Sequence, residues 1–267
     1  MSPDIEYVKR VGIGAACKGA AVLRSYFNQS FEINRKGEKD LVTSADTASE
    51  AAIIEVIKYR FPDHAILAEE SGFTDGSGGL QWIIDPLDGT TNFAHGIGQY
   101  AVSIAFAIDN EVVAGVVLNP ETGELFTAVQ GKTAELNGRP IHVSTTGDIS
   151  DALLVTGFPY DFKDHIRSLV ERFQRCLAAA QGIRRLGSAA LDLCYVACGR
   201  FDGFWEERLK PWDTAAGMLI ARQAGAKITD FSGCSFSPEK QELLATNSVI
   251  HESMLTLLKE YEVFNDK

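Results

Sequence analysis

The stretch WIIDPLDGTTNF, residues 82–93, decides how this chain folds. Its apolar start predicts a buried strand, and that strand ends at two carboxylates, Asp85 and Asp88. Asp-Gly is a strong signal for a hairpin turn, so one interpretation is a corner between two strands. The other is a site that holds a cation, because neighbouring carboxylates in one crevice repel each other unless a positive charge compensates them.

Carboxylates stand at two further junctions between an apolar strand and a turn or helix. Glu69 and Glu70 follow a predicted strand at 65–68, and Asp213 precedes a predicted helix. Each has an ordinary explanation: Glu69 and Glu70 as a solvated strand end, and Asp213 as an N-cap that accepts hydrogen bonds from the first turn. Because strand ends of an α/β sheet converge, however, we expect the three clusters to meet in one crevice.

Such a crevice requires cations. Hard oxygen ligands without His or Cys select Mg²⁺, Mn²⁺ or Ca²⁺ over zinc. Pro86 stiffens the backbone after Asp85, so the carbonyl of Leu87 can be held towards a metal as well. Gly89 and Thr90 offer backbone amides at a predicted helix start, which suits a phosphate. A metal beside phosphate-binding amides predicts phosphoryl chemistry.

Helical and strand-like segments alternate along the 267 residues, which favours an α/β class. No repeat or linker divides the chain, so we expect a single domain over 1–267, with an N-terminal part to about residue 145 and a C-terminal part from about residue 146. Helices are expected at about 5–27, 44–60, 164–180, 189–198, 213–224 and 252–260. Strands are expected at about 65–68, 80–84, 153–156, 203–206 and 226–229, with an antiparallel sheet over 100–136.

Composition excludes several classes of protein. The formal net charge of −11 disfavours binding to nucleic acid or to an anionic membrane. No apolar run reaches the ~18 residues of a membrane helix, and the charged N-terminal stretch does not match a signal peptide. Five scattered cysteines (17, 176, 194, 198 and 234) predict no disulfide framework. We therefore expect a cytoplasmic protein with no membrane and no direct nucleic-acid partner.

Two signature stretches, WIIDPLDGTTNF (82–93) and PWDTAAGMLIARQAGAKITD (211–230), together with AEES (68–71), resemble the inositol monophosphatase family. The likeness continues through DLVTSAD, TGFPYD and GSAALDLCYVACGRFDGFWE, and those segments look closest to bacterial inositol-1-monophosphatases of the extragenic-suppressor type. The resemblance implies an αβαβα sandwich of the sugar-phosphatase fold and Mg²⁺-dependent hydrolysis of a phosphomonoester. The small substrate would be a phosphorylated polyol or sugar, and the protein a homodimer.

The resemblance also implies metal ligands. Glu69, Asp85 and the Leu87 carbonyl resemble the ligands of a first metal ion. Asp85 would bridge to a second ion, held by Asp88 and Asp213. Two or three Mg²⁺ ions per chain are expected, with Mn²⁺ or Ca²⁺ able to occupy the same sites and Li⁺ expected to inhibit.

Catalytic roles follow from the same resemblance. Thr90, supported by Asp46 and Glu70, resembles the group that orients the attacking water, and the amides of Gly89 and Thr90 would hold the phosphate. A threonine hydroxyl is too weak an acid to act as a nucleophile without a strong base, which also favours orienting a water. Two metals roughly 3.5–4 Å apart would activate that water and stabilise the leaving oxygen.

The residues expected to line the substrate are Gly187, Ser188 and Ala189. Glu206 would accept a hydrogen bond from a sugar hydroxyl. Lys36 lies in a polar loop that, in this family, can close over the site. Arg184 precedes the GSAA stretch, and its neighbour Arg185 could serve in the pocket equally well.

Other functions fit the motifs of this sequence less well. A haloacid-dehalogenase-type phosphatase requires Asp-x-Asp, and the spacing here is Asp-x-x-Asp. The stretch GIGAACKG (12–19) lacks the full G-x-G-x-x-G pattern of a nucleotide loop and fits close helix packing better. Fructose-1,6-bisphosphatase, histidinol-phosphatase and 3′-phosphoadenosine phosphatase activities are alternatives; a second phosphate favours extra basic residues, which the sequence does not place. A non-catalytic protein-binding role is the alternative from another class.

Overall fold

The computed structural model describes residues 3–27, 33–35, 41–159, 163 and 165–259. Its helices are α1 (Ile5–Tyr26), α2 (Ser44–Arg60), α3 (Thr90–Ala94), α4 (Ile166–Ala179), α5 (Ala189–Ala197), α6 (Pro211–Gln223) and α7 (His251–Leu258), with a short 3-10 turn, η1 (Ile149–Asp151). An eight-stranded sheet contains, in spatial order, β10 (Arg139–Pro140), β9 (Glu135–Leu136), β8 (Leu125–Val129), β7 (Glu111–Leu118), β6 (Ala101–Ile108), β5 (Leu80–Asp88), β3 (Ala65–Ala68) and β4 (Gly72–Thr74). A five-stranded sheet contains β12 (Gly182–Arg184), β11 (Leu153–Thr156), β13 (Gly203–Glu207), β15 (Glu242–Thr246) and β14 (Lys227–Thr229), and β1 (Ile33–Arg35) pairs with β2 (Leu41–Thr43).

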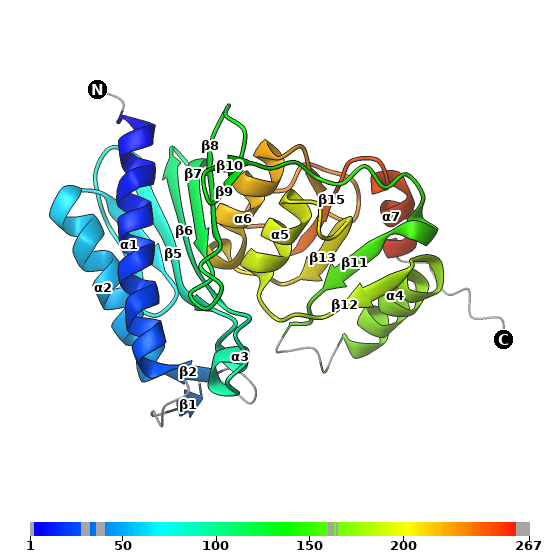
Figure 1. Ribbon diagram of the computed structural model, residues 1–267, viewed down its shortest axis with the longest axis horizontal. Coiled ribbons are helices and arrows are strands. Elements are labelled where there is room, and N and C mark those ends of the chain that lie inside the picture. Colours follow the sequence, from blue (N-terminus) through cyan, green and yellow to red (C-terminus); the bar gives the residue numbers. More distant parts are fainter. Residues whose placement is uncertain (1–2, 28–32, 36–40, 160–162, 164, 260–267) are drawn as a thin grey trace.

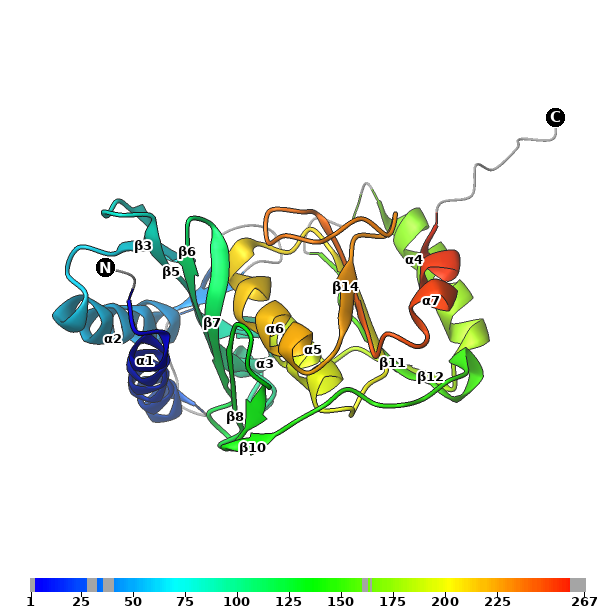
Figure 2. The ribbon, with the colours of Figure 1, turned by 90° about the horizontal axis from the view of Figure 1, so that it is seen from above.

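These elements stack in five layers. Figure 1 shows α1 and α2, then the eight-stranded sheet, then α5 and α6, then the five-stranded sheet, and finally α4 and α7. The view from above in Figure 2 has the same order. The αβαβα sandwich expected from the sequence is therefore confirmed. No helix among the described residues is both long enough and apolar enough to cross a bilayer.

The outer helix layer forms where the alanine- and glycine-rich segment was expected to pack closely. Asp4 caps α1, its side chain accepting hydrogen bonds from the amides of Glu6 and Tyr7. A Cβ at Gly19 would lie 2.8 Å from both Ile53 and Ser49 of α2. The GIGAACKG stretch thus lies inside α1, and its last glycine permits close contact between α1 and α2.

The middle layer positions two helix starts that matter below. α5 and α6 are packed between the two sheets, and their small residues permit the contact. A Cβ at Gly217 of α6 would lie 2.9 Å from Leu193 of α5, and one at Gly115 of β7 would lie 2.9 Å from the Ala216 carbonyl. The N-termini of α5 and α6 therefore meet at one place between the sheets.

Several elements differ from the sequence expectations. The helix expected from Asp213 begins at Pro211, with Lys210 as its N-cap, so Asp213 is the third helical residue and not the cap. Proline at the first helical position moves the start forward, because its fixed φ suits a helix and its missing N–H has no partner there. Strands β12 and β15 were not predicted, because three and five residues carry too little periodicity to be recognised.

A buried histidine makes the stability of the second sheet depend on pH. His251 is fully buried, with Nδ1 2.8 Å from Thr246 Oγ1 and Nε2 3.0 Å from Thr229 Oγ1. Burial, with a smaller effect from Lys227 and partly opposed by Glu252, lowers the pKa of His251 to about 4. The unfolded chain therefore binds an extra proton at any pH between the folded and unfolded pKa values.

We predict that the stability contributed by neutral His251 is present above about pH 6.5 and is lost as the pH falls towards 4. The loss is up to about 3 kcal/mol, from 1.36 kcal/mol per pKa unit. Urea unfolding from pH 7 to 4 measures it, and His251→Gln should flatten the profile. The exposed His95→Gln is the control for removal of an imidazole. Parallel profiles for wild type and His251→Gln would contradict the assignment.

Candidate active site

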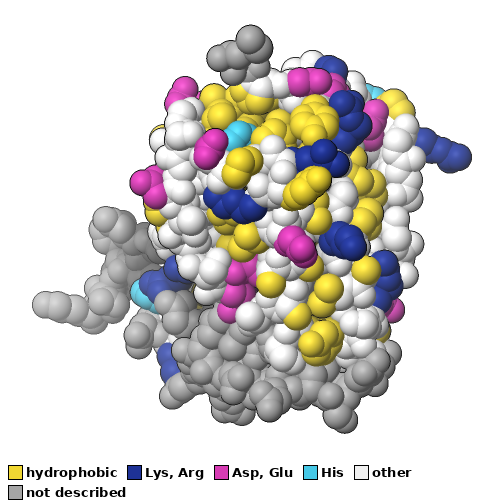
Figure 3. Space-filling view, turned by 90° about the vertical axis from the view of Figure 1, so that its left-hand side faces the viewer, with side chains coloured by type: hydrophobic (Ala, Val, Ile, Leu, Met, Phe, Trp, Pro, Cys, Tyr) yellow, Lys and Arg dark blue, Asp and Glu magenta, His cyan; other side chains and the backbone are white. Residues whose placement is uncertain are grey.

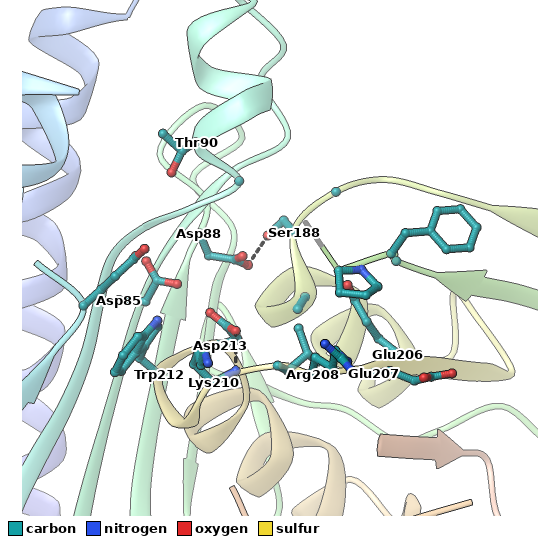
Figure 4. A pocket seen from close by; sticks show the side chains of 18 of the residues that line it. Asp85, Asp88, Thr90, Ser188, Glu206, Glu207, Arg208, Lys210, Trp212 and Asp213 are labelled. Carbon is teal, nitrogen blue, oxygen red and sulfur yellow. Dashed lines mark hydrogen bonds between the residues drawn. The ribbon is translucent and has the colours of Figure 1, made fainter. Parts of the chain in front are cut away.

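A cavity of about 570 Å³ lies where the eight-stranded sheet, α5, α6 and the five-stranded sheet meet. This volume is typical of a small-molecule site. Its walls come from the end of β5, the residue after β3, the starts of α5 and α6, and the ends of β11 and β13. Figure 4 shows the side chains of Asp85, Asp88 and Asp213 pointing into the same space.

A bulge in β5 allows Asp85 and Asp88 to share the cavity. Asp85 pairs with Ser103 and Asp88 with Ala101, so one extra residue is inserted between them. On a regular strand, residues three apart point to opposite faces, and a bulge re-aims one of them. Pro86 lies in the bulge, where its missing N–H costs no ladder hydrogen bond. The Asp-x-x-Asp spacing therefore fits this site because the strand is irregular.

The start of α5 holds Asp88. The Ser188 hydroxyl and the Ala190 amide both donate to Asp88 Oδ2, the amide at 2.8 Å. Burial raises the pKa of Asp88 to about 6, and those donors and Arg185 work against the rise. Asp88, for which a hairpin corner was one interpretation, is thus hydrogen-bonded to the C-terminal part of the chain. The Asp-Gly pair enters α3 and not a two-residue hairpin.

The other carboxylates crowd the same cavity. Asp85 is buried, and its pKa is raised well above the usual range by burial and then by the charges of Glu69, Asp88 and Asp213. Burial and the charge of Asp88 likewise raise the pKa of Asp213, although Asp213 Oδ2 accepts from the Lys210 amide at 2.6 Å. Glu69 lines the cavity directly after β3. Four carboxylates therefore oppose one another's ionisation, as the sequence predicted for this crevice.

The donor set fits a hard divalent cation, since it consists of carboxylate and carbonyl oxygens. Among the described residues, no group of three or more Asp, Glu, His or Cys side chains stands close enough to enclose a metal ion as placed. The mutual repulsion that raises their pKa values acts over longer distances than coordination does. Ion binding would therefore draw these carboxylates together, and a cation would offset the repulsion that contributes to their raised pKa values.

The segment after the bulge presents Thr90. Gly89 has a φ of 97°, a left-handed conformation that favours glycine, and a Cβ there would lie 3.0 Å from the Gln99 carbonyl. Thr90 Oγ1 lies 3.2 Å from Asp46 Oδ1 and 3.1 Å from the Leu87 carbonyl, and either oxygen can accept a hydrogen bond from the Thr90 hydroxyl. The structure thus places Gly89, Thr90 and Leu87 in the cavity wall, with Asp46 behind Thr90.

Glu70 is placed differently from Glu69. It does not line the cavity, and its amide donates to Glu50 Oε2 at 2.8 Å. The next amide, that of Ser71, donates to Glu50 Oε1 at 2.9 Å. Buried Glu50 of α2, which the sequence gave no reason to select, thus fixes the turn that presents Glu69.

Gly187, Ser188, Ala189 and Glu206, the residues expected to contact a substrate, line the cavity. The expectation for Arg184 is corrected, because Arg184 lies at the exposed end of β12 outside the cavity wall and Arg185 lines it instead. Successive residues of an extended chain point to opposite sides, so only one of the two arginines can face inward.

Lys36, expected in a loop that can close over the site, lies outside the described residues.

Burial raises the pKa of Glu206 to about 8, opposed by the positive charge of Arg185 and aided by Asp88. Its carboxylate rests against Gly157, where a Cβ would lie 2.1 Å from Glu206 Oε2. Gly157 belongs to the GFPYDF stretch after β11, and that glycine leaves room for the carboxylate.

Sequence reasoning missed part of the wall. The lining residues that the sequence did not single out include Lys210, Trp212 and Gln241, whereas Phe158 and Pro159 belong to the GFPYDF stretch expected to influence the choice of substrate. Trp212 directly precedes Asp213 in the second signature stretch, and Lys210 directly precedes that stretch; this proximity was the available signal. Gln241 gave no signal, because it enters through the pairing of β13 with β15.

The family model of the inositol monophosphatases matches residues 4–262. An inositol-1-monophosphatase of Synechocystis is 44% identical over 253 residues, covering 94% of this chain and 88% of that protein. A protein of Pseudomonas aeruginosa named Nus factor SuhB is 43% identical over 234 residues, covering 86% of each. The crystal structure of extragenic suppressor protein suhB from Bartonella henselae has a TM-score of 0.91 at 40% identity, over 95% of this chain and 99% of that one.

Asp213→Asn should raise the midpoint of thermal unfolding in chelator, because it removes one of the opposing charges while keeping an oxygen for the Lys210 amide. In wild type, Mg²⁺ at 100 times its Kd should stabilise by about 2.7 kcal/mol, and the variant should lose most of this gain. Calorimetry with and without Mg²⁺ measures both effects.

Asp230→Asn is the matched control, since Asp230 lies outside the cavity and pairs with Lys240 at 2.6 Å. It should be less stable in chelator and keep the Mg²⁺ gain. An Asp213→Asn variant that behaves like Asp230→Asn would contradict the electrostatic description of the cavity.

Gly157→Ala should displace the Glu206 carboxylate, because the new methyl occupies its position. The far end of a side chain can move at small cost, so we expect little change in stability but a several-fold higher KM for the substrate. Steady-state kinetics together with thermal unfolding separate the two. Gly147→Ala, where a Cβ meets nothing within 4 Å, is the control, and equal KM values for the two variants would rule out the assigned contact.

Proposed function

Because this chain belongs to the inositol monophosphatase family, we propose that it is a Mg²⁺-dependent phosphomonoesterase that releases phosphate from inositol 1-phosphate. Family membership supports a phosphatase of the inositol monophosphatase type. The observation that carries the finer proposal is the cavity in which four mutually repelling carboxylates face the Thr90–Asp46 pair.

The residues proposed to hold the ions are Glu69, Asp85, Asp88 and Asp213, with the Leu87 carbonyl. When bound, two or three Mg²⁺ ions would supply charge neutralisation on the phosphoryl oxygens and lower the pKa of water. Mn²⁺ or Ca²⁺ would fit the same oxygen donors, and we propose that Li⁺ inhibits by occupying one position.

Thr90 is proposed to orient the attacking water. Since its hydroxyl donates towards Asp46, the Thr90 oxygen is left to accept a hydrogen bond from a water in the cavity. The proton of that water would then pass towards the Thr90–Asp46 pair. Glu70 is proposed to support Thr90 in orienting the water, from the turn that carries Glu69 and without lining the cavity itself.

Gly89 and Thr90 amides are proposed to hold the phosphate, while Glu206 and the segment Gly187 to Ala189 would contact the polyol. No described Cys or His lines the cavity, so its wall offers neither as a group to form a phosphoenzyme. Water attack is therefore the reaction that this set of residues supports best.

The direct test is phosphate release from a panel of phosphomonoesters over a Mg²⁺ titration. We expect hydrolysis of inositol 1-phosphate that disappears with chelator and returns with Mg²⁺. Absence of phosphate release from every ester at every Mg²⁺ concentration would refute the enzymatic proposal.

Thr90→Ala should lower kcat by about 10²–10⁴-fold, the usual contribution of a group that positions or transfers a proton. Because Thr90 is not a proposed metal ligand, the Mg²⁺-induced rise in the unfolding midpoint should persist. Thr91→Ala, one residue along the same helix, is the matched comparison. Loss of the Mg²⁺ effect in Thr90→Ala would contradict the assigned role.

A second candidate is a role apart from hydrolysis, through binding another protein. Relatives 40–43% identical to this chain carry the name Nus factor SuhB, and that name is the observation that favours it. An Asp213→Asn variant that restores a deletion phenotype without hydrolysing any ester would favour the second candidate.

We also propose a homodimer, for which a sedimentation mass of twice 29.0 kDa is the expected result.

A further inference from the structure

Cations line the side of the cavity that extends away from Asp85. Figure 4 shows, in order across the cavity, Asp85, Lys210, Arg208 and Glu207. Arg185 lines the same cavity from the segment before α5. We call Arg185, Arg208 and Lys210 the cationic side.

Two of these cations make no close ion pair with a described residue. Neither Arg185 nor Lys210 forms a side-chain ion pair or hydrogen bond to a described carboxylate. Arg185 faces inward: a Cβ on Gly187 would lie 2.5 Å from its Nη1, and its charge reaches the carboxylates of Asp88 and Glu206 without a direct hydrogen bond to either. A guanidinium that faces a cavity and leaves its N–H groups unused by carboxylates of the described chain is suited to an anionic ligand.

Arg208 is held at the cavity in an unfavourable backbone conformation. Its φ is 62°, which is uncommon for a residue with a Cβ and costs on the order of 1 kcal/mol or more. The Arg208 amide donates to the Gln241 carbonyl, and its Nη2 contacts His165. The Arg208 side chain lines the cavity from this strained position.

The nearby carboxylate does not cancel these charges. Glu207 forms an ion pair with Arg172, whose side chain is 4% exposed and which also donates to the Leu258 carbonyl at 3.0 Å. Glu207 is therefore committed to a cation outside the cavity. The cavity of this chain, whose net charge is −11, thus carries three basic side chains on the side away from Asp85.

We propose that the cationic side binds a second phosphate, so that the chain favours polyol or sugar bisphosphates over the corresponding monophosphates. The scissile phosphate lies among the carboxylates and their cations, and the second phosphate lies against Arg185, Arg208 and Lys210. Guanidinium and ammonium groups donate charge-assisted hydrogen bonds to phosphate oxygens. The inference rests on the proposed phosphatase activity and specifies its substrate class.

The test compares esters that share the scissile bond. Initial rates of phosphate release are measured for myo-inositol 1,4-bisphosphate and myo-inositol 1-phosphate in Mg²⁺, since the 4-position lies across the ring from the scissile ester. We expect a KM at least tenfold lower for the bisphosphate, equivalent to about 1.4 kcal/mol, and a preference that weakens as salt is raised.

Variants of the cationic side test which residues produce the preference for the bisphosphate. Arg208→Asn removes the charge but tolerates the left-handed backbone, and Lys210→Gln keeps the backbone amide that holds Asp213. Each should reduce the ratio of the two kcat/KM values at least threefold, and the double variant should bring it close to one. Arg208→Lys, which retains the charge, should keep most of the preference, and Arg139→Gln, on an exposed strand outside the cavity, controls for net charge.

Equal KM values for both esters in wild type, or an unchanged ratio in the double variant, would overturn the second-phosphate site. Failure to hydrolyse either ester would instead overturn the proposed function. In that case calorimetric titration of both esters into Thr90→Ala with Mg²⁺ still decides: tighter binding of the bisphosphate supports the site, and equal affinity refutes it.

Discussion

Mutual repulsion among buried carboxylates is the constraint on which this molecule depends. Asp85 and Asp88 are 2% and 9% exposed, and burial is the largest cause of their raised pKa values. The charges of Glu69, Asp88 and Asp213 raise the pKa of Asp85 further, and that of Asp88 raises the pKa of Asp213. Placing like charges together in a protein interior costs stability unless something compensates them. We expect a bound cation to offset this repulsion, and the cation in turn to attract an anionic substrate.

The surrounding architecture is arranged to sustain that repulsion. The bulge at Pro86 turns two residues of one strand towards the same cavity. The start of α5 donates two hydrogen bonds to Asp88, and the start of α6 carries Asp213. Both helices are packed between the two sheets, so the carboxylates are held by the most buried layer of the sandwich (Figure 1). Asp85, Asp88 and Asp213 are thus positioned by regular elements of the sandwich, and Glu69 by the turn that Glu50 holds.

The exterior gives little indication of this arrangement. Figure 3 shows the α1 and α2 side of the molecule, where hydrophobic, basic and acidic side chains are interspersed. No single sign of charge dominates the described part of that face. This face therefore differs from the cavity, where carboxylates are crowded together.

Much of this was predictable, and the failures have physical causes. The long helices and the strand ending at Asp85 have strong periodicity, and the order of the signature stretches predicted the family. That Asp88 and Asp213 share a cavity also followed from the convergence of strand ends. The bulge could not be predicted, because it depends on pairing between Asp85 and Ser103 on another strand. The choice between Arg184 and Arg185 depended on the register of a three-residue strand, and Glu50 acts through backbone amides that carry no sequence signal.

Anomalous diffraction from crystals soaked in Mn²⁺ would show whether the cavity holds a cation, because it locates the ion without relying on activity. We expect strong peaks within coordination distance of Asp85, Asp88 and Asp213, weakened in Asp213→Asn. Crystals that show no peak in this cavity at saturating Mn²⁺, or peaks only at other carboxylates, would contradict this expectation.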